Sequence, residues 1–243
     1  MKKLKDFVLI RINGSLGERL LIWASSIKLL VKRINSKFRN KETANDQLYV
    51  DLDLPSGLKW AKCNVGAEKE TDYGYYFQWG EIETHNTDIP CDWANHKYGD
   101  GWNFSKYNTS VLYGENPDNI MALKAEDDAA RANMCGEWRM PTKDEFQELL
   151  DNTTNEWVTN FNGSRVNGRK FTGSNGNYIF IPASGSRSVY SSRSQGYDGY
   201  IWSSSLNASN PNYAWYLGFF WDYCGMGHYG RRCVGFAVRG VMD

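Results

Sequence analysis

Hydrophobic and polar positions alternate most regularly near the end of the chain. Trp215, Leu217 and Phe219 share one side of a predicted strand, and the residues between them share the other. A second alternation at 235–241 predicts a closing strand. The intervening residues 223–234 show no period and are rich in Tyr, His, Arg and Gly, which are common on recognition surfaces. This stretch is therefore predicted to be a loop-like binding surface; an ordinary Gly-rich connection is the alternative.

A different pattern occupies the beginning of the chain, at residues 16–38. Apolar residues recur there at alternating steps of 4 and 3, which predicts a helix with a narrow seam of the coiled-coil type. Ser15 and Glu18 have the spacing of a capping box at its start. The seam residues are Leu16, Leu20, Trp23, Ile27, Leu30 and Ile34.

Three roles fit this helix. We predict that it forms a homo-oligomer or docks to a partner; lying on a membrane surface and packing on its own globular domain are the alternatives. The apolar run at 20–24 is the longest in the segment and is too short to span a bilayer, so no transmembrane segment is expected. No signal peptide is legible either. The polar residues 39–47 are predicted to be a linker, which gives an N-terminal segment at 1–47.

The globular body is predicted to span residues 48–243. Residues 49–60 alternate and break at Pro-Ser-Gly, which predicts a hairpin. Further short strands are predicted at 73–79, 168–172 and 178–182.

Two helices are predicted within this body. At 142–152, a Thr-x-x-Glu capping box precedes an apolar stripe. At 121–134, the acidic residues Glu126, Asp127 and Asp128 are expected to form a solvated face. Arg139, between the two helices, is expected to form a structural ion pair or to clamp the backbone.

A long segment without a sustained period, residues 83–113, predicts extended loops. Trp93, Trp102 and Phe104 are expected to tie these loops to a core. Few helices among many short, mostly antiparallel strands are typical of the α+β class.

Charge divides the 243 residues unevenly. Residues 1–41 hold eleven Lys and Arg against two acidic residues, a balance of +9; of the 28 basic and 28 acidic residues in all, 17 and 26 remain, a balance of −9. An acidic body is a poor partner for phosphate backbones, so nucleic-acid binding is not expected. The 5 cysteines show neither zinc-ligand spacing nor an even count for a disulfide framework.

Several separated motifs carry a family resemblance. They are VDLDLPSGLKWAKCNVGA at 50–67, DYGYYFQWGE at 72–81, EDDAARANMCGEWRMPTKDEFQELLDN at 126–152, IFIPASGSR from Ile179 and YIWSSSLN at 200–207, with GFAVR near the end. Together they resemble the FISUMP domain (Fibrobacter succinogenes major paralogous domain), which is common in gut Bacteroidales. The resemblance implies a C-type lectin fold, similar to formylglycine-generating enzymes, with two helices, short strands and long loops, preceded by the N-terminal helix.

A second resemblance concerns the C-terminal stretch. Many such domains are variable proteins of diversity-generating retroelements, in which an adenine-directed reverse transcriptase rewrites Asn (AAY) codons. Writing Asn at selected positions within 213–234, with Trp215, Leu217 and Met226 kept as scaffold, gives a segment similar to the templates of this family; Trp221 is not reachable from AAY. The resemblance implies these ligand-binding, variable positions: Tyr213, Tyr216, Gly218, Phe220, Trp221, Tyr223, Gly225, Gly227, His228, Tyr229, Gly230, Arg232, Cys233 and Val234.

Such variability imposes a physical requirement. An arbitrary residue in a close-packed core costs about 1–5 kcal/mol, so variable side chains must face solvent from a frame that is stabilised elsewhere. The predicted frame consists of Trp202, Trp215, Leu217, Phe219, Phe236 and Val238. The predicted contact residues in this variant are Tyr213, Tyr216, Phe220, Tyr223, His228, Tyr229 and Arg232, with Tyr and Arg as the expected hot spots.

We therefore predict a non-enzymatic receptor-binding or adhesive protein for a protein or glycan ligand on a cell surface, without cofactor or metal. Phage particle and bacterial envelope remain open as carriers. The alternatives are an undiversified sugar-binding lectin, calcium-dependent or not, and a structural fibre or tip protein. Asp198 and Asp222 are too few for a calcium cage. Cys224 and Cys233 lie farther apart than the cysteine pair of formylglycine-generating enzymes.

Overall fold

A computed structural model describes residues 49–85, 90–189 and 191–243. The chain divides into two units, Met1–Gln47 and Leu48–Asp243, and all described residues belong to the second. The predicted helix at 16–38, its seam and the linker lie outside the described residues. The roles assigned to the two domains stay predictions.

Strands dominate the part of the chain that the structure describes, with 37% of residues in strands against 14% in helices. The strands are β1 (Tyr49–Asp51), β2 (Lys59–Asn64), β3 (Tyr76–Phe77), β4 (Thr154–Val158), β5 (Gly168–Thr172), β6 (Tyr178–Pro182), β7 (Ser186–Ser188), β8 (Ser191–Arg193), β9 (Gly199–Leu206), β10 (Tyr213–Phe220), β11 (Tyr223–Arg231), β12 (Phe236–Ala237) and β13 (Arg239–Met242). The helices are α2 (Ala129–Asn133) and α3 (Lys143–Asn152), with 3-10 turns η1 (Trp93–Asn95), η2 (Val111–Tyr113), η3 (Ala125–Asp127) and η4 (Phe161–Gly163).

The predicted fold class, α+β with a C-type lectin fold, is wrong. The described residues form several small sheets with little helix, which is a mostly β architecture and does not identify a C-type lectin fold. Two misread segments account for much of the difference. The helix predicted at 121–134 is reduced to η3 and the short α2, because the Asp128 side chain caps a new helix by accepting the Arg131 N–H at 3.0 Å. The loop predicted at 223–234 is largely the strand β11.

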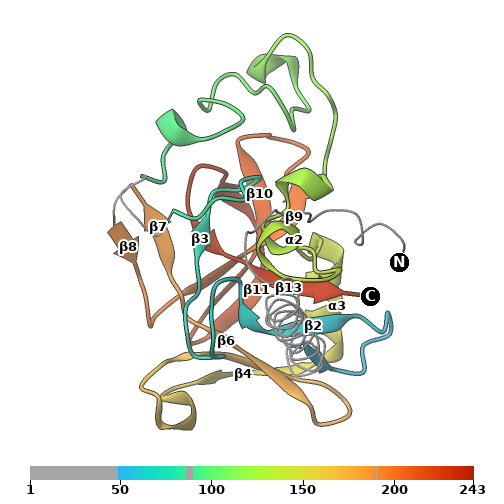
Figure 1. The fold of residues 1–243 in the computed structure, drawn as a ribbon, viewed down its shortest axis with the longest axis vertical. Helices are drawn as coiled ribbons and strands as arrows, with labels where there is room; N and C mark the ends of the chain where they lie inside the picture. Colours follow the sequence, from blue (N-terminus) through green and yellow to red (C-terminus); the bar gives the residue numbers. More distant parts are fainter. Residues whose placement is uncertain (1–48, 86–89, 190) are drawn as a thin grey trace, which may run out of the picture. The chain divides into compact units, whose positions relative to one another are not determined.

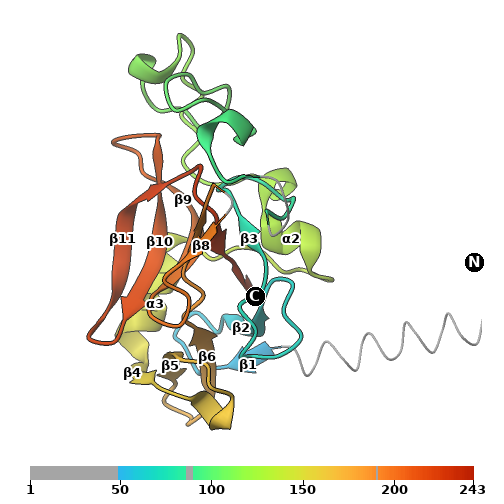
Figure 2. The ribbon, with the colours of Figure 1, turned by 90° about the vertical axis from the view of Figure 1, so that its left-hand side faces the viewer.

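The largest sheet has five strands in the order β11-β10-β9-β12-β3. Its strands pair antiparallel, except that β12 runs parallel to β9. Figure 2 shows β9, β10 and β11 side by side, with β11 at the outer margin. Three smaller antiparallel sheets follow the orders β1-β2-β13, β4-β5-β6 and β7-β8 (Figure 1).

The five-stranded sheet has a hydrophobic cluster on each face. Adjacent residues of β9 point to opposite faces, so Ile201 belongs to one cluster and Trp202 to the other. On the Ile201 side, Leu217 and Phe219 of β10 pack with α3 residues such as Leu149. On the Trp202 side, the cluster continues into the long loops that precede α2.

Local predictions hold best around α3. Thr142 caps this helix, and Glu145 completes the capping box as predicted. Arg139 donates from Nη1 and Nη2 to the two carboxylate oxygens of Glu145 at 2.8 and 2.7 Å, which confirms the structural ion pair. The predicted strands at 168–172 and 178–182 are confirmed as β5 and β6.

The predicted solvated face at 121–134 is wrong for two of its three residues, because Asp127 and Asp128 are buried and only Glu126 is exposed. The Asp127 carboxylate accepts hydrogen bonds from the Tyr98 and Tyr107 hydroxyls and from the Lys97 and Lys106 ammonium groups. Burial opposes ionisation of this carboxyl, yet the hydrogen bonds outweigh burial and lower the pKa of Asp127 below its ordinary value. All four partners come from the loops, so a long-range network replaces the expected contact with solvent.

Candidate ligand-binding surface

The predicted variable region folds as a β-hairpin. Strand β10 leads through the turn residues Trp221 and Asp222 into β11, and the two strands pair along most of their length. The sequence obscured β11 because Gly225 and Gly227 leave alternate positions without a side chain, which removes the period-2 signal.

Six predicted variable positions share one face of this hairpin. Residues directly opposite each other in an antiparallel ladder project to the same side. The opposed pairs are Tyr216 with Gly227, Gly218 with Gly225, and Phe220 with Tyr223. We call these six residues the hairpin face. These six positions thus lie together, while the frame residues Leu217 and Phe219 point to the other side and are fully buried; that their identities vary stays a prediction.

The aromatic residues of the hairpin face differ in exposure. The rings of Phe220 and Tyr223 stack with centroids 5.1 Å apart, and the two residues are 38% and 45% exposed. Tyr216 is half-buried, 5.3 Å from the Phe236 ring and 5.8 Å from that of Tyr200. Burial raises the pKa of the Tyr216 hydroxyl. The outer half of the face therefore offers open aromatic surface, and the inner half is joined to the core.

Tyr216 also restricts its glycine neighbours. A Cβ atom at Gly227 would lie 2.3 Å from a Tyr216 ring atom, and one at Gly230 would lie 2.5 Å from the Trp202 ring. Any larger residue at Gly227 requires the Tyr216 ring to move. The identities of residues 216 and 227 are therefore coupled by packing.

A second aromatic group surrounds a bulge at the far end of the hairpin. The Tyr229 ring lies 4.0 Å from His228 and 5.6 Å from Tyr213. The regular register is interrupted between Ala214 and Tyr216, and the carbonyl of His228 accepts a hydrogen bond from the Asn207 side chain at 2.8 Å. These three predicted contact residues therefore form their own patch, apart from the hairpin face.

Trp215 was predicted to belong to the buried frame, and this is wrong, because the residue is half-buried and part of neither hydrophobic cluster. Its ring lies 5.2 Å from His228 and 5.5 Å from the Lys143 ammonium. The other five frame residues are buried as predicted: Trp202, Leu217, Phe219, Phe236 and Val238. Tyr200, which contacts Tyr216, was not predicted as part of this surface; its position two residues before the buried Trp202, on the same face of β9, was the available signal.

Arg232 is not a contact residue, which corrects the prediction, because it is fully buried. Its Nη1 donates to the carbonyls of Tyr107 and Pro211, each at 3.1 Å, and its guanidinium lies 4.4 Å from the Phe104 ring centre. Desolvation lowers the pKa of Arg232 to about 9. After β11 the chain turns inward, so this arginine fastens the long loop to the end of the hairpin.

The remaining predicted positions lie in mixed surroundings. Cys233 and Gly230 are buried and Val234 is half-buried, so none of them is an open contact. Trp221, at the hairpin turn, is 71% exposed. In the loops, Phe104 is buried as expected, but Trp102 is exposed and does not tie its segment to the core.

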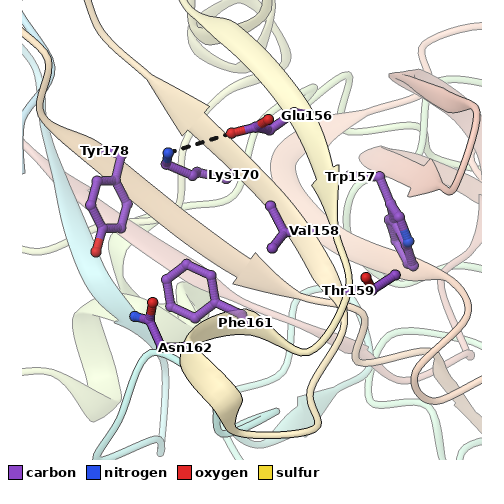
Figure 3. A pocket seen from close by; sticks show the side chains of 8 residues that line it. All are labelled: Glu156, Trp157, Val158, Thr159, Phe161, Asn162, Lys170 and Tyr178. Carbon is purple, nitrogen blue, oxygen red and sulfur yellow. Dashed lines mark hydrogen bonds and ion pairs between the residues drawn. The ribbon is translucent and has the colours of Figure 1, made fainter.

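A shallow hollow of about 510 Å³ lies elsewhere, on the β4-β5-β6 sheet (Figure 3). Its two charged groups are paired with each other. Lys170 Nζ lies 3.4 Å from Glu156 Oε1 and 5.0 Å from the centre of the Tyr178 ring. None of the predicted site residues lines this hollow, whose walls are Glu156, Trp157, Val158, Thr159, Phe161, Asn162, Lys170 and Tyr178.

The described ranges, 49–85, 90–189 and 191–243, contain neither a cluster of metal ligands nor a membrane-spanning helix. No three His, Cys, Asp or Glu side chains there are placed to hold a metal ion. No helix in the same ranges is long and apolar enough to cross a bilayer.

Residues 50–241 match the family of the Lcl C-terminal domain. This family is associated with variable, C-type-lectin-like proteins of diversity-generating retroelements. Comparison with curated proteins and with solved structures gave no match. The matched span includes the whole β10–β11 hairpin and most of both hydrophobic clusters.

Proposed function

We propose that this chain, which belongs to the family of the Lcl C-terminal domain, is a non-enzymatic ligand-binding protein with exchangeable side chains on its hairpin face. The ligand is a protein or glycan on a cell surface, and the chain acts as a receptor-binding protein or adhesin. A diversity-generating retroelement rewrites the exposed positions. The motifs quoted above support a FISUMP-type protein of Bacteroidales or their phages.

One observation carries the proposal. Along β10, residues with predicted variable identity face away from the α3 side, and the residues between them, Leu217 and Phe219, are fully buried on that side. A change at Phe220 or Tyr223 thus leaves the cluster beneath the sheet intact. This arrangement allows a binding surface to vary without loss of the fold.

The chemistry of the surface also supports binding. Phe220, Tyr223 and Tyr229 are all exposed, and aromatic side chains contribute strongly to interface energies because they bury large area at a low entropic cost. Individually weak contacts gain from avidity if the N-terminal helix joins several copies.

The first experiment tests tolerance of change. A triple variant, F220N/Y223N/Y229N, should keep a melting temperature within a few degrees of the parent chain, because it removes only exposed rings. The matched control, Phe219→Asn, places a polar group in the cluster and should unfold or melt far lower. A similar decrease in melting temperature for the triple variant and for Phe219→Asn would contradict the proposal that the exposed side chains can be exchanged.

A genomic observation tests diversification itself. The DNA near the gene should contain a near-copy of the hairpin segment with Asn codons at the variable positions, beside a reverse transcriptase gene. Without these two sequences, the chain would be a ligand-binding domain of fixed sequence.

A further inference from the structure

β11 forms an unprotected sheet edge. It pairs with β10 and, within the described ranges, with no second strand (Figure 2). Its residues 223–230 include no Lys, Arg, Asp, Glu or Pro, the residues that commonly prevent edge strands from pairing. The opposite edge, β3, has only 2 residues. β11 is therefore the edge of this sheet best suited to accept another strand.

The outward backbone groups of β11 can be identified from its neighbours. The Tyr213 carbonyl accepts a hydrogen bond from the N–H of Asn207, the residue after β9, at 3.0 Å. The Trp215 carbonyl accepts one from the Ser203 hydroxyl of β9 at 2.9 Å. Odd-numbered residues of β10 thus face β9, and the even-numbered ones face β11. Since paired residues alternate along an antiparallel ladder, Cys224 and Met226 direct their N–H and C=O groups to the open edge.

We propose that two copies of this chain pair antiparallel through β11, around a two-fold axis at Gly225. In this register Cys224 lies opposite Met226 of the second copy, and each pair exchanges two backbone hydrogen bonds. Gly225 faces its own counterpart across the axis. With the axis shifted by one residue, either Cys224 would lie opposite His228 beside the bulge, or Met226 would lie opposite Asp222 in the turn, so that the outward groups of that residue would lose a regular partner.

The side chains complement each other in the same register. Tyr223 lies opposite Gly227 of the second copy, so an aromatic ring covers a position without a side chain. Trp221, in the turn before β11, and Tyr229, near the other end of the strand, are 71% and 66% exposed and come near each other across the axis. Asp222 approaches His228 of the second copy, which places a carboxylate beside an imidazole. Both hairpin faces point to the same side and form one continuous surface.

This inference does not rest on diversification, because every residue except proline supplies the backbone groups that the pairing uses. The first test is sedimentation of the full chain. The wild-type chain should associate as its concentration rises. Gly225→Lys places two like charges directly opposite each other and should weaken association about tenfold or more. Mixing it with Gly225→Glu should restore the heterodimer. Phe220→Lys, on the same face but one strand inward, is the charge control and should associate normally.

The second test reports the register, in a Cys135→Ser background that removes an exposed thiol. Gly225→Cys should form an intermolecular disulfide, because the Cα atoms of a non-hydrogen-bonded antiparallel pair lie about 4.5 Å apart. Oxidised glutathione takes up the two electrons released by the two thiols and is reduced to two molecules of glutathione. Tyr229→Cys, exposed but off the axis, is the control. The proposal would be overturned if the wild-type chain stayed monomeric, or if Gly225→Lys associated as strongly as the wild type. It would also be overturned if Gly225→Cys cross-linked no faster than Tyr229→Cys.

Discussion

The hairpin face and the β4-β5-β6 sheet are both antiparallel surfaces that reach solvent, but their side chains are linked differently. On β4 and β5, Lys170 is paired with Glu156, and Arg169 donates from Nε to Asn155 Oδ1 at 2.8 Å. On the hairpin face, three of six positions are glycine, and within the described residues no ion pair or hydrogen bond links the side chains of the six to one another. The Phe220 carbonyl accepts a hydrogen bond from Arg169 Nη1 at 3.3 Å, which involves the backbone of this position and not its side chain.

The difference indicates which surface can change. Cross-linked polar pairs fix the identity of both partners, because replacing one leaves the other without its partner. Aromatic side chains that stack on each other or lie over glycine leave no polar partner unpaired when they are replaced, so they restrict the identities of their neighbours less. The β4-β5-β6 sheet also has an aromatic pair, in which the Phe161 ring of η4 stacks on Phe180 with centroids 3.9 Å apart. Both of these residues are buried, unlike Phe220 and Tyr223 on the hairpin face.

The largest effect should come from comparing one phenylalanine on each surface. Phe180→Ala removes a fully buried ring and should lower the free energy of unfolding by about 3–5 kcal/mol. Phe220→Ala removes a ring that is 38% exposed and should cost less than about 1 kcal/mol. Denaturant unfolding of both variants measures the difference. Equal losses would show that the hairpin face is packed as tightly as the sheet beneath η4.

Arg231, at the end of β11, and Arg232, just after it, differ in whether their side chains can be replaced. Arg232→Ala leaves buried carbonyls of Tyr107 and Pro211 without their donor and should cost about 3 kcal/mol. Arg231→Ala changes an exposed side chain and should stay within about 0.5 kcal/mol. Urea unfolding at constant pH provides the measurement. A small effect at Arg232 would return this residue to the set of free contact positions.

The coupling between Tyr216 and Gly227 predicts an intermediate effect. Gly227→Val places side-chain atoms against the Tyr216 ring and should cost about 1–3 kcal/mol. In a chain that already carries Tyr216→Asn, the same change should be nearly neutral, since the ring that caused the clash is gone. A double-mutant cycle in unfolding free energy gives the interaction. Additive effects would mean that the two positions vary independently.

The smallest expected effect concerns the ion pair on the other sheet. Glu156 and Lys170 lie on neighbouring strands with partly exposed side chains, so their coupling energy should be roughly 0.2–1 kcal/mol. The cycle E156Q, K170M and the double variant measures it, and the value should fall at high salt. Coupling that does not respond to salt would point to packing rather than charge.

Local signals in the sequence predicted local features well. The cap of α3 at Thr142, the strands β5 and β6, and the Arg139–Glu145 pair all depend on residues close together in the chain or on clear turns. The alternation along β10 likewise separated Leu217 and Phe219 from their neighbours.

Features that depend on distant contacts were not predictable in this way. Asp127 is buried because its partners Tyr98 and Lys106 arrive from a loop without periodicity. Arg232 resembles an exposed loop residue in sequence, and only the fold brings aromatic rings and carbonyls around it. β11 was missed because glycine carries no hydrophobic signal, so the strand is recognisable only through its pairing with β10.

The Tyr216 ring over Gly227 has a consequence for any population of sequence variants of this chain. A bulky residue at 216 disfavours large residues at 227, and a small residue at 216 admits many. The repertoire of folded variants is therefore smaller than the product of choices at each site, and its members should show statistical correlation between these two positions. Sequencing many variants would reveal that correlation as a record of packing.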